Sequence, residues 1–250
     1  GAALTEAEGH YRAATKIADE YDLDAEVTLM IWFEWGNLCI ERGDYNTASE
    51  KFRQVHQRAV RRQSPYFEAL SLNNQAYATL LMGASTDAQA LMERAVALTE
   101  IYGLPAVQYY LLSTSGEIAL VTGALDQAEK QFTAAILLAE KYDNHTFVAN
   151  LQAHLGRVEW ARGHLSKAEQ LLQQAKAALT PGHGRFLQIQ IDLWLATVML
   201  EAQQFVDAAT CLGNAEERLA ATEYRALQLV ATQLQTQLPM TASAPQIEQG

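Results

Sequence analysis

Small and large apolar residues recur along the chain with a period of 40. Glycine stands at positions 43, 83, 123 and 163, and Gln203 takes the next place. Five residues later comes an alanine, and four residues after the alanine comes a large apolar side chain. These pairs are Ala48 and Phe52, Ala88 and Met92, Ala128 and Phe132, Ala168 and Leu172, and Ala208 and Leu212. Self-similarity at a fixed period of this size predicts a repeat architecture rather than one globular core.

Each 40-residue period contains two stretches of helical three-and-four apolar spacing, separated by the glycine. Glycine ends a helix readily because it adopts the left-handed conformation without strain. Since the intervening turns are short, the two helices should be antiparallel neighbours. The pattern therefore predicts an all-α solenoid of about five helix hairpins, at 24–62, 66–102, 105–141, 145–179 and 184–220. A partial unit at 3–21 and a cap helix at 222–237 should complete one domain over 1–237, followed by a disordered tail at 238–250.

Composition and charge argue against several classes of function. The net charge of −11 argues against nucleic acid as a ligand, because phosphate binding needs a clustered basic surface. The sequence has no apolar run long enough to cross a bilayer, so we expect no membrane association and a cytoplasmic location. Cys39 and Cys211 lie far apart on apolar helical positions, where we expect buried thiols. The six histidines form no metal-binding spacing and no nucleophile–base pair is visible, so we expect no cofactor, no metal site and no enzyme.

The repeat pattern resembles the tetratricopeptide repeat. The first period contains Trp32-x2-Trp35-Gly36-x2-Cys39 followed by Ala48-x3-Phe52, and a later one contains Leu112-x2-Ser115-Gly116 followed by Ala128-x3-Phe132. The resemblance implies a right-handed α-α superhelix. The usual repeat has about 34 residues, whereas this one has 40 and is similar to the sensor arms of bacterial STAND signal-transduction ATPases, including maltose-regulator-like transcription activators. The chain itself contains no G-x-x-x-x-G-K-[ST] phosphate loop.

The resemblance also implies that ligands bind on a concave face lined by the first helix of each hairpin. The positions carried over from the family, with two flanking residues, are Phe33, Asn37, Asn73, Tyr77, Tyr110, Ser113, Glu117, His154, Arg157 and Trp194. We expect Asn37, Asn73, Glu117 and Arg157 to be exposed, because charged and amide groups are costly to bury unpaired. Asn37 resembles an asparagine of the clamp that some co-chaperones use to bind a C-terminal carboxylate. Phe33 and Leu70 stand where that clamp has lysines, so we reject the clamp.

Two functions are consistent with these observations. The first is a binding scaffold, the sensor or protein-interaction module of a larger signalling or transcription regulator. Its partner would be a peptide or protein, with a small-molecule inducer as an alternative. The second is a structural module that mediates self-association without a small ligand.

Overall fold

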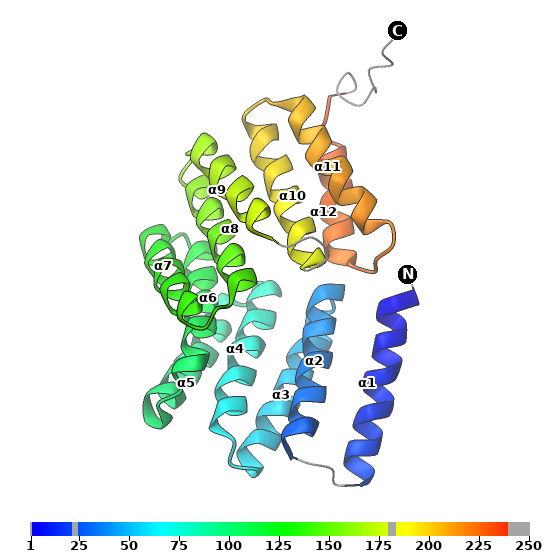
Figure 1. Ribbon diagram of the computed structural model, residues 1–250, viewed down its shortest axis with the longest axis vertical. Helices are drawn as coiled ribbons and strands as arrows, with labels where there is room; N and C mark the ends of the chain where they lie inside the picture. Colours follow the sequence, from blue (N-terminus) through cyan, green and yellow to red (C-terminus); the bar gives the residue numbers. More distant parts are fainter. Residues whose placement is uncertain (1, 22–24, 180–183, 240–250) are drawn as a thin grey trace. The chain divides into compact units, whose positions relative to one another are not determined.

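The computed structural model describes residues 2–21, 25–179 and 184–239. These residues form twelve α-helices and no β-strand, which confirms the all-α prediction (Figure 1). The helices are α1 (Ala2–Glu20), α2 (Ala25–Arg42), α3 (Tyr45–Arg61), α4 (Pro65–Leu81), α5 (Ser85–Tyr102), α6 (Pro105–Val121), α7 (Leu125–Lys141), α8 (His145–Ala161), α9 (Leu165–Ala178), α10 (Arg185–Glu201), α11 (Phe205–Leu219) and α12 (Arg225–Gln235). The predicted tail lies mostly at 240–250, outside the described residues.

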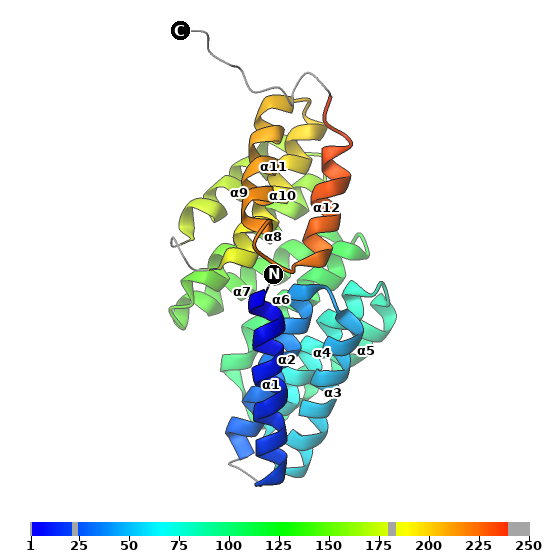
Figure 2. The same ribbon diagram turned by 90° about the vertical axis from the view of Figure 1, so that its right-hand side faces the viewer.

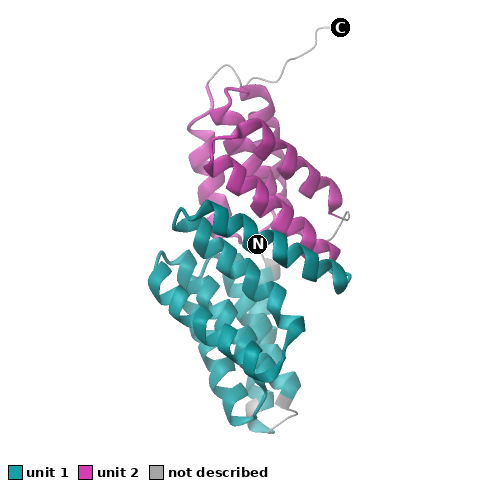
Figure 3. Cartoon of the chain, turned by 90° about the vertical axis from the view of Figure 1, so that its left-hand side faces the viewer, with its two compact units in different colours: residues 1–144 teal, residues 145–250 magenta. Residues whose placement is uncertain are grey.

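The chain divides into two compact units, residues 1–144 and residues 145–250 (Figure 3). Unit 1 holds α1 and the hairpins α2–α3, α4–α5 and α6–α7, and unit 2 holds the hairpins α8–α9 and α10–α11 followed by α12. Figure 2 gives a second view of the chain. In unit 1, α2 packs against both α1 and α3. None of the described helices combines the length and the apolar character that crossing a membrane would require.

The turn inside each hairpin uses the left-handed conformation that the sequence predicts. The φ angles of Gly43, Gly83, Gly123 and Gly163 lie between 80° and 86°, and Gln203 has a φ of 60° at the equivalent place. Helix α12 begins at Arg225, 40 residues after the first residue of α10, so it continues the register of the first helices. The cap helix predicted at 222–237 therefore follows the same repeat as the rest.

The repeated alanines and large apolar residues form the hairpin core. All five alanines of the second helices are at most 1% exposed, and the five large residues that follow them are at most 2% exposed. The two helices of a hairpin approach each other closely at small residues of the first helix. A Cβ atom added at Gly36 would lie 2.6 Å from the Phe52 ring, and one added at Gly116 would lie 2.6 Å from the Phe132 ring. The helices therefore approach closely only because these positions carry no side chain.

The first helices also contact one another from hairpin to hairpin. In unit 1, α4 packs against α2 and α6 as well as against α3 and α5, and in unit 2, α10 packs against α8 and α12 as well as α9 and α11. A first helix is consequently buried on several sides, and only a narrow strip of its surface reaches solvent. We call these strips the first-helix face of unit 1, on α2, α4 and α6, and the first-helix face of unit 2, on α8 and α10.

Candidate functional site

The first-helix face of unit 1 contains seven of the ten residues that the sequence predicts as ligand contacts. Three of them are partly accessible to solvent, namely Asn37, Tyr77 and Tyr110. Four are buried, with exposed fractions of 4–8%, namely Phe33, Asn73, Ser113 and Glu117. The expected exposure of Asn73 and Glu117 is therefore wrong. Both lie on first helices that are packed between neighbours on two sides, which the period of the sequence did not reveal.

A ladder of side-chain amides crosses from α4 to α2 on this face. Asn73 Nδ2 donates to Asn74 Oδ1 at 2.9 Å, and Asn74 Nδ2 donates to Asn37 Oδ1 at 2.9 Å. Asn37 Nδ2 in turn donates to Glu34 Oε2 at 3.2 Å. We call Asn73, Asn74, Asn37 and Glu34 the amide ladder. At its inner end, Asn73 Oδ1 is buried and accepts no hydrogen bond from any residue that the structure describes.

Negative charge gathers at the outer end of the amide ladder. Glu34, Asn37 and Glu41 share one side of α2, since they are spaced by three and four residues. Glu34 is exposed and Glu41 is half-buried. The pKa of Tyr11 on α1 is raised, first by burial of its hydroxyl and then by the charges of Glu34 and Glu41. The Tyr11 phenol therefore lies near both carboxylates.

Tyrosines from the start of α6 and the end of α7 meet in unit 1. The ring of Tyr109 lies 4.1 Å from that of Tyr110 and 5.7 Å from that of Tyr142. Asn144 Nδ2 is 3.5 Å from the Tyr109 hydroxyl. Burial and a hydrogen bond with Tyr109 raise the pKa of Tyr110, so its hydroxyl stays protonated.

The first-helix face of unit 2 brings together the three remaining predicted residues. The guanidinium of Arg157 lies 4.9 Å from the centre of the Trp194 ring, and its Nη1 is 2.9 Å from Nδ1 of His154. The rings of His154 and Trp194 are 5.6 Å apart. Because an arginine can only donate, Nδ1 of His154 accepts and the neutral ring carries its proton on Nε2. Arg157 and Trp194 are partly accessible, whereas His154 is only 5% exposed.

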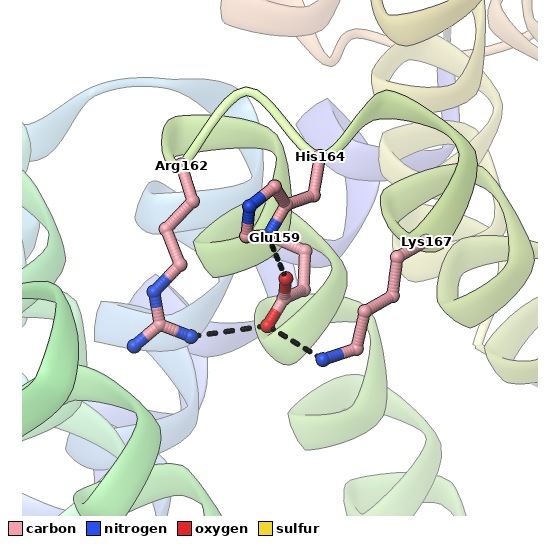
Figure 4. A network of polar contacts seen from close by, with 4 residues as sticks. All are labelled: Glu159, Arg162, His164 and Lys167. Carbon is pink, nitrogen blue, oxygen red and sulfur yellow. Dashed lines mark hydrogen bonds and ion pairs between the residues drawn. The ribbon is translucent and has the colours of Figure 1, made fainter.

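Sequence reasoning missed a polar cluster at the turn between α8 and α9. Glu159 is 3% exposed and accepts from Arg162 at 3.0 Å, His164 at 2.7 Å and Lys167 at 3.0 Å (Figure 4). Burial alone would raise the pKa of Glu159, but hydrogen bonds from His164 and Lys167 and the nearby cations lower it to about 2. The side chain of His164 is 61% exposed, and its contact with the buried carboxylate helps to fix the turn. No repeated signal could have indicated this cluster, since Cys39, Thr79, Ala119 and Met199 stand at the place of Glu159 in the other hairpins.

A second buried carboxylate in unit 2 joins three helices. Asp192 on α10 has no exposed surface, and it lies 2.5 Å from Lys176 Nζ on α9 and 2.6 Å from Arg218 Nη1 on α11. Both carboxylates are therefore neutralised by bases, and we assign them to the packing of unit 2 rather than to a ligand.

The structure gives little support for reactive groups in the part of the chain it describes. The thiols of Cys39 and Cys211 are buried as expected, and burial raises the pKa of Cys39 to about 11. No group of three or more histidine, cysteine or acidic side chains is arranged to hold a metal ion among the described residues.

Comparison with known proteins agrees with this architecture. The sequence model of the tetratricopeptide repeat family matches residues 109–180. No curated protein matches the chain. Among solved structures, BtubC (BKLC) from P. vanneervenii is 19% identical, with 88% of this chain and 89% of that chain covered and a TM-score of 0.59.

Two further structures share the fold. A Rap protein complexed with Competence and Sporulation Factor is 11% identical, with a TM-score of 0.72. The alignment covers 93% of this chain and 68% of the Rap protein. A Signal Transduction ATPase with Numerous Domains (STAND) protein with a tetratricopeptide repeat sensor, from Pyrococcus horikoshii, is 11% identical with a TM-score of 0.56. That alignment covers 90% of this chain and 36% of the STAND protein.

The fold and its two polar faces define a helical-repeat scaffold of the kind that is typical of protein-interaction modules. Residues 109–180 match the tetratricopeptide repeat model, and the sequence period of this chain is 40 residues instead of the usual 34 or so.

Proposed function

We propose that this chain is the recognition module of a larger signalling or transcription regulator. Its first-helix faces would bind an extended peptide or a protein segment. The amide ladder of unit 1 is the observation that carries the proposal. Asn37 and Asn74 are partly accessible amides, and among the described residues their side-chain hydrogen bonds all go to other members of the amide ladder. Side-chain amides of this kind suit the N–H and C=O groups of an extended backbone.

Tyr77 and Tyr110 would extend the contact surface of unit 1, and the buried Ser113 would support it from below. On unit 2, we propose that His154, Arg157 and Trp194 form a second contact, in which the indole supplies area and the guanidinium supplies a charged donor. Phe33, Asn73 and Glu117 are buried, and their contribution would be to position accessible neighbours rather than to touch the ligand.

Ligand binding would act by population shift. A module of this kind changes the activity of an attached domain only if the ligand binds one arrangement of the whole regulator more tightly than another. The likeness to a STAND protein with a tetratricopeptide repeat sensor supports this context for the chain. A cytoplasmic location is part of the same proposal.

A module for self-association is the second candidate, and one side chain favours it. Leu229 of α12 is 61% exposed, whereas Ile189, at the same register position of α10, has no exposed surface. The open side of α12 could therefore receive a further helix.

A peptide library displayed on phage would test the first candidate. We expect the protein to retain a set of related peptides, and we expect the variant Asn37→Ala/Tyr77→Ala to lose them while its far-ultraviolet circular dichroism stays unchanged. Arg157→Ala should weaken the binding of those peptides that contact unit 2. If these variants alter only the molar mass measured by light scattering, the self-association candidate is correct instead.

A further inference from the structure

One polar contact in unit 1 joins two second helices directly. On α3, His56 is half-buried, and its Nε2 lies 3.2 Å from Nη2 of Arg94 on α5. Both helices pack against α4, and the amide ladder joins the first helices α2 and α4 of the same two hairpins. The hairpins α2–α3 and α4–α5 are therefore linked by polar side chains at their first helices and again at their second helices.

The contact between α3 and α5 requires an uncharged histidine. An arginine can only donate, so Nε2 of His56 must accept, and the neutral ring carries its proton on Nδ1. A ring that takes up a second proton has a donor at each nitrogen, and it then turns an N–H group and a positive charge toward the guanidinium of Arg94. Protonation therefore removes the hydrogen bond and places two cations next to each other.

The surroundings of His56 favour the neutral ring. Burial lowers the pKa of His56 from its ordinary value of 6.5, the charge of Arg94 lowers it further, and the backbone of Glu68 on α4 raises it more weakly. The carboxyl group of Glu68 does not pair with the ring, since burial alone raises the pKa of Glu68. Neither α2 nor α4, the helices packed against α3, brings another charged side chain of the described residues to act on the pKa of His56. Arg94 in turn makes no other polar contact with a described residue.

We propose that His56 and Arg94 form a pH-sensitive latch between α3 and α5, which is closed while the imidazole is neutral and opens when it is protonated. This goes beyond the proposed function, since the latch needs no ligand. Because the folded pKa of His56 is the lower one, the latch stabilises the fold fully above pH 6.5, and this contribution is lost as the pH falls below that value. An open latch leaves α3 and α5 packed against α4, so the hairpins stay folded while α5 gains freedom to move relative to α3.

Nuclear magnetic resonance of the protein labelled with ¹³C at its histidines follows the titration of His56. In Arg94→Met the pH at which His56 takes up its proton should rise, because a cation beside the ring is removed while the aliphatic stem is kept. Arg61→Met is the matched control, since it removes the same charge from an exposed position further along α3. It should leave the titration of His56 almost unchanged. Identical titrations of His56 in the natural protein and in Arg94→Met would overturn the inference.

Amide hydrogen exchange measures the opening of the latch itself. Between about pH 7.5 and about pH 5.5, and after correction for the intrinsic effect of pH, exchange in α3 and α5 should become about three- to tenfold faster, as expected for the loss of one hydrogen bond. His56→Gln keeps an oxygen that can accept from Arg94 and does not titrate, so the acceleration should disappear. His10→Gln is the control, because His10 is an exposed histidine on α1, and the acceleration should remain. An acceleration that persists in His56→Gln, or its absence from the natural protein, would overturn the inference.

Discussion

Two buried carboxylates of unit 2 and one exposed carboxylate of unit 1 lie in opposite surroundings. In unit 2, Glu159 and Asp192 are buried and each is neutralised by bases of its own hairpins. In unit 1, Glu34 is exposed and its contact in the amide ladder is an asparagine. A carboxylate that the fold has already neutralised serves stability, whereas one left at the surface among acceptors is available to a partner. The comparison therefore separates carboxylates that the fold neutralises from a carboxylate that it leaves at the surface.

The largest effect should come from removing both bases around Asp192. In Lys176→Met/Arg218→Met a fully buried carboxylate loses its counter-charges, and the free energy of unfolding of unit 2 should fall by about 3–5 kcal/mol. Urea unfolding followed by circular dichroism measures this change. Arg53→Met is the control, since Arg53 pairs with Glu50 at the surface and should contribute less than about 1 kcal/mol. Similar losses in both variants would contradict a structural role for Asp192.

The pH dependence of stability should reveal how much the charge of Glu159 contributes to the folded state. Its pKa falls from the ordinary value of 4.5 to about 2 in the folded protein, which corresponds to about 3 kcal/mol of stability. Because the folded pKa is the lower one, this contribution is complete above pH 4.5 and disappears as the pH falls toward 2. The variant Glu159→Gln should therefore be less stable than the natural protein at pH 7, with a difference that shrinks between pH 4.5 and 2. A difference that stays constant over that range would show that the charge of Glu159 is not responsible.

Interrupting the amide ladder should have a smaller effect on stability. Asn74→Ala removes two side-chain hydrogen bonds and should lower the free energy of unfolding by about 1–2 kcal/mol. It should also weaken the binding of peptides selected from the phage library, because Asn37 loses the hydrogen-bond partner that orients it. Urea unfolding and the fluorescence anisotropy of a labelled peptide measure the two changes separately. Unchanged peptide affinity in a folded Asn74→Ala protein would exclude the ladder from recognition.

The smallest effect concerns the exposed carboxylate of unit 2. Glu201 accepts from Trp160 Nε1 at 2.8 Å from an exposed position. Trp160→Phe should lower stability by no more than about 1 kcal/mol, since water can satisfy Glu201. A loss as large as that of the Asp192 variant would remove the distinction between buried and surface carboxylates.

The fold could be predicted because its turn residues and its close helix contacts recur along the sequence. Four turn glycines and Gln203 mark the same left-handed position, and Gly36 and Gly116 mark the same close contact with a phenylalanine. A period of 40 makes each such residue visible several times, so the hairpins and their boundaries follow from the sequence. The predicted single domain over 1–237 remains a prediction, as does the disordered tail.

The site was harder to predict because its polar contacts do not repeat. The sequence identified Asn37 and Asn73 but gave no reason to link them through Asn74, which lies one residue outside the predicted line. Burial of Glu117 and Asn73 depends on how closely neighbouring first helices pack, and spacing within one helix does not determine that distance. Glu159 and His164 belong to one turn alone, so periodicity carried no information about them.

Hydrogen–deuterium exchange with a peptide selected from the phage library tests the central claim most directly. If the first-helix face of unit 1 recognises an extended segment, saturating peptide should slow amide exchange in α2 and α4 and leave the second helix α3 unchanged. Asn37→Ala/Tyr77→Ala should abolish this slowing, and Glu100→Gln, a change at an exposed position of α5, should preserve it. Slower exchange confined to α8 and α10, or to second helices such as α3, would contradict the account.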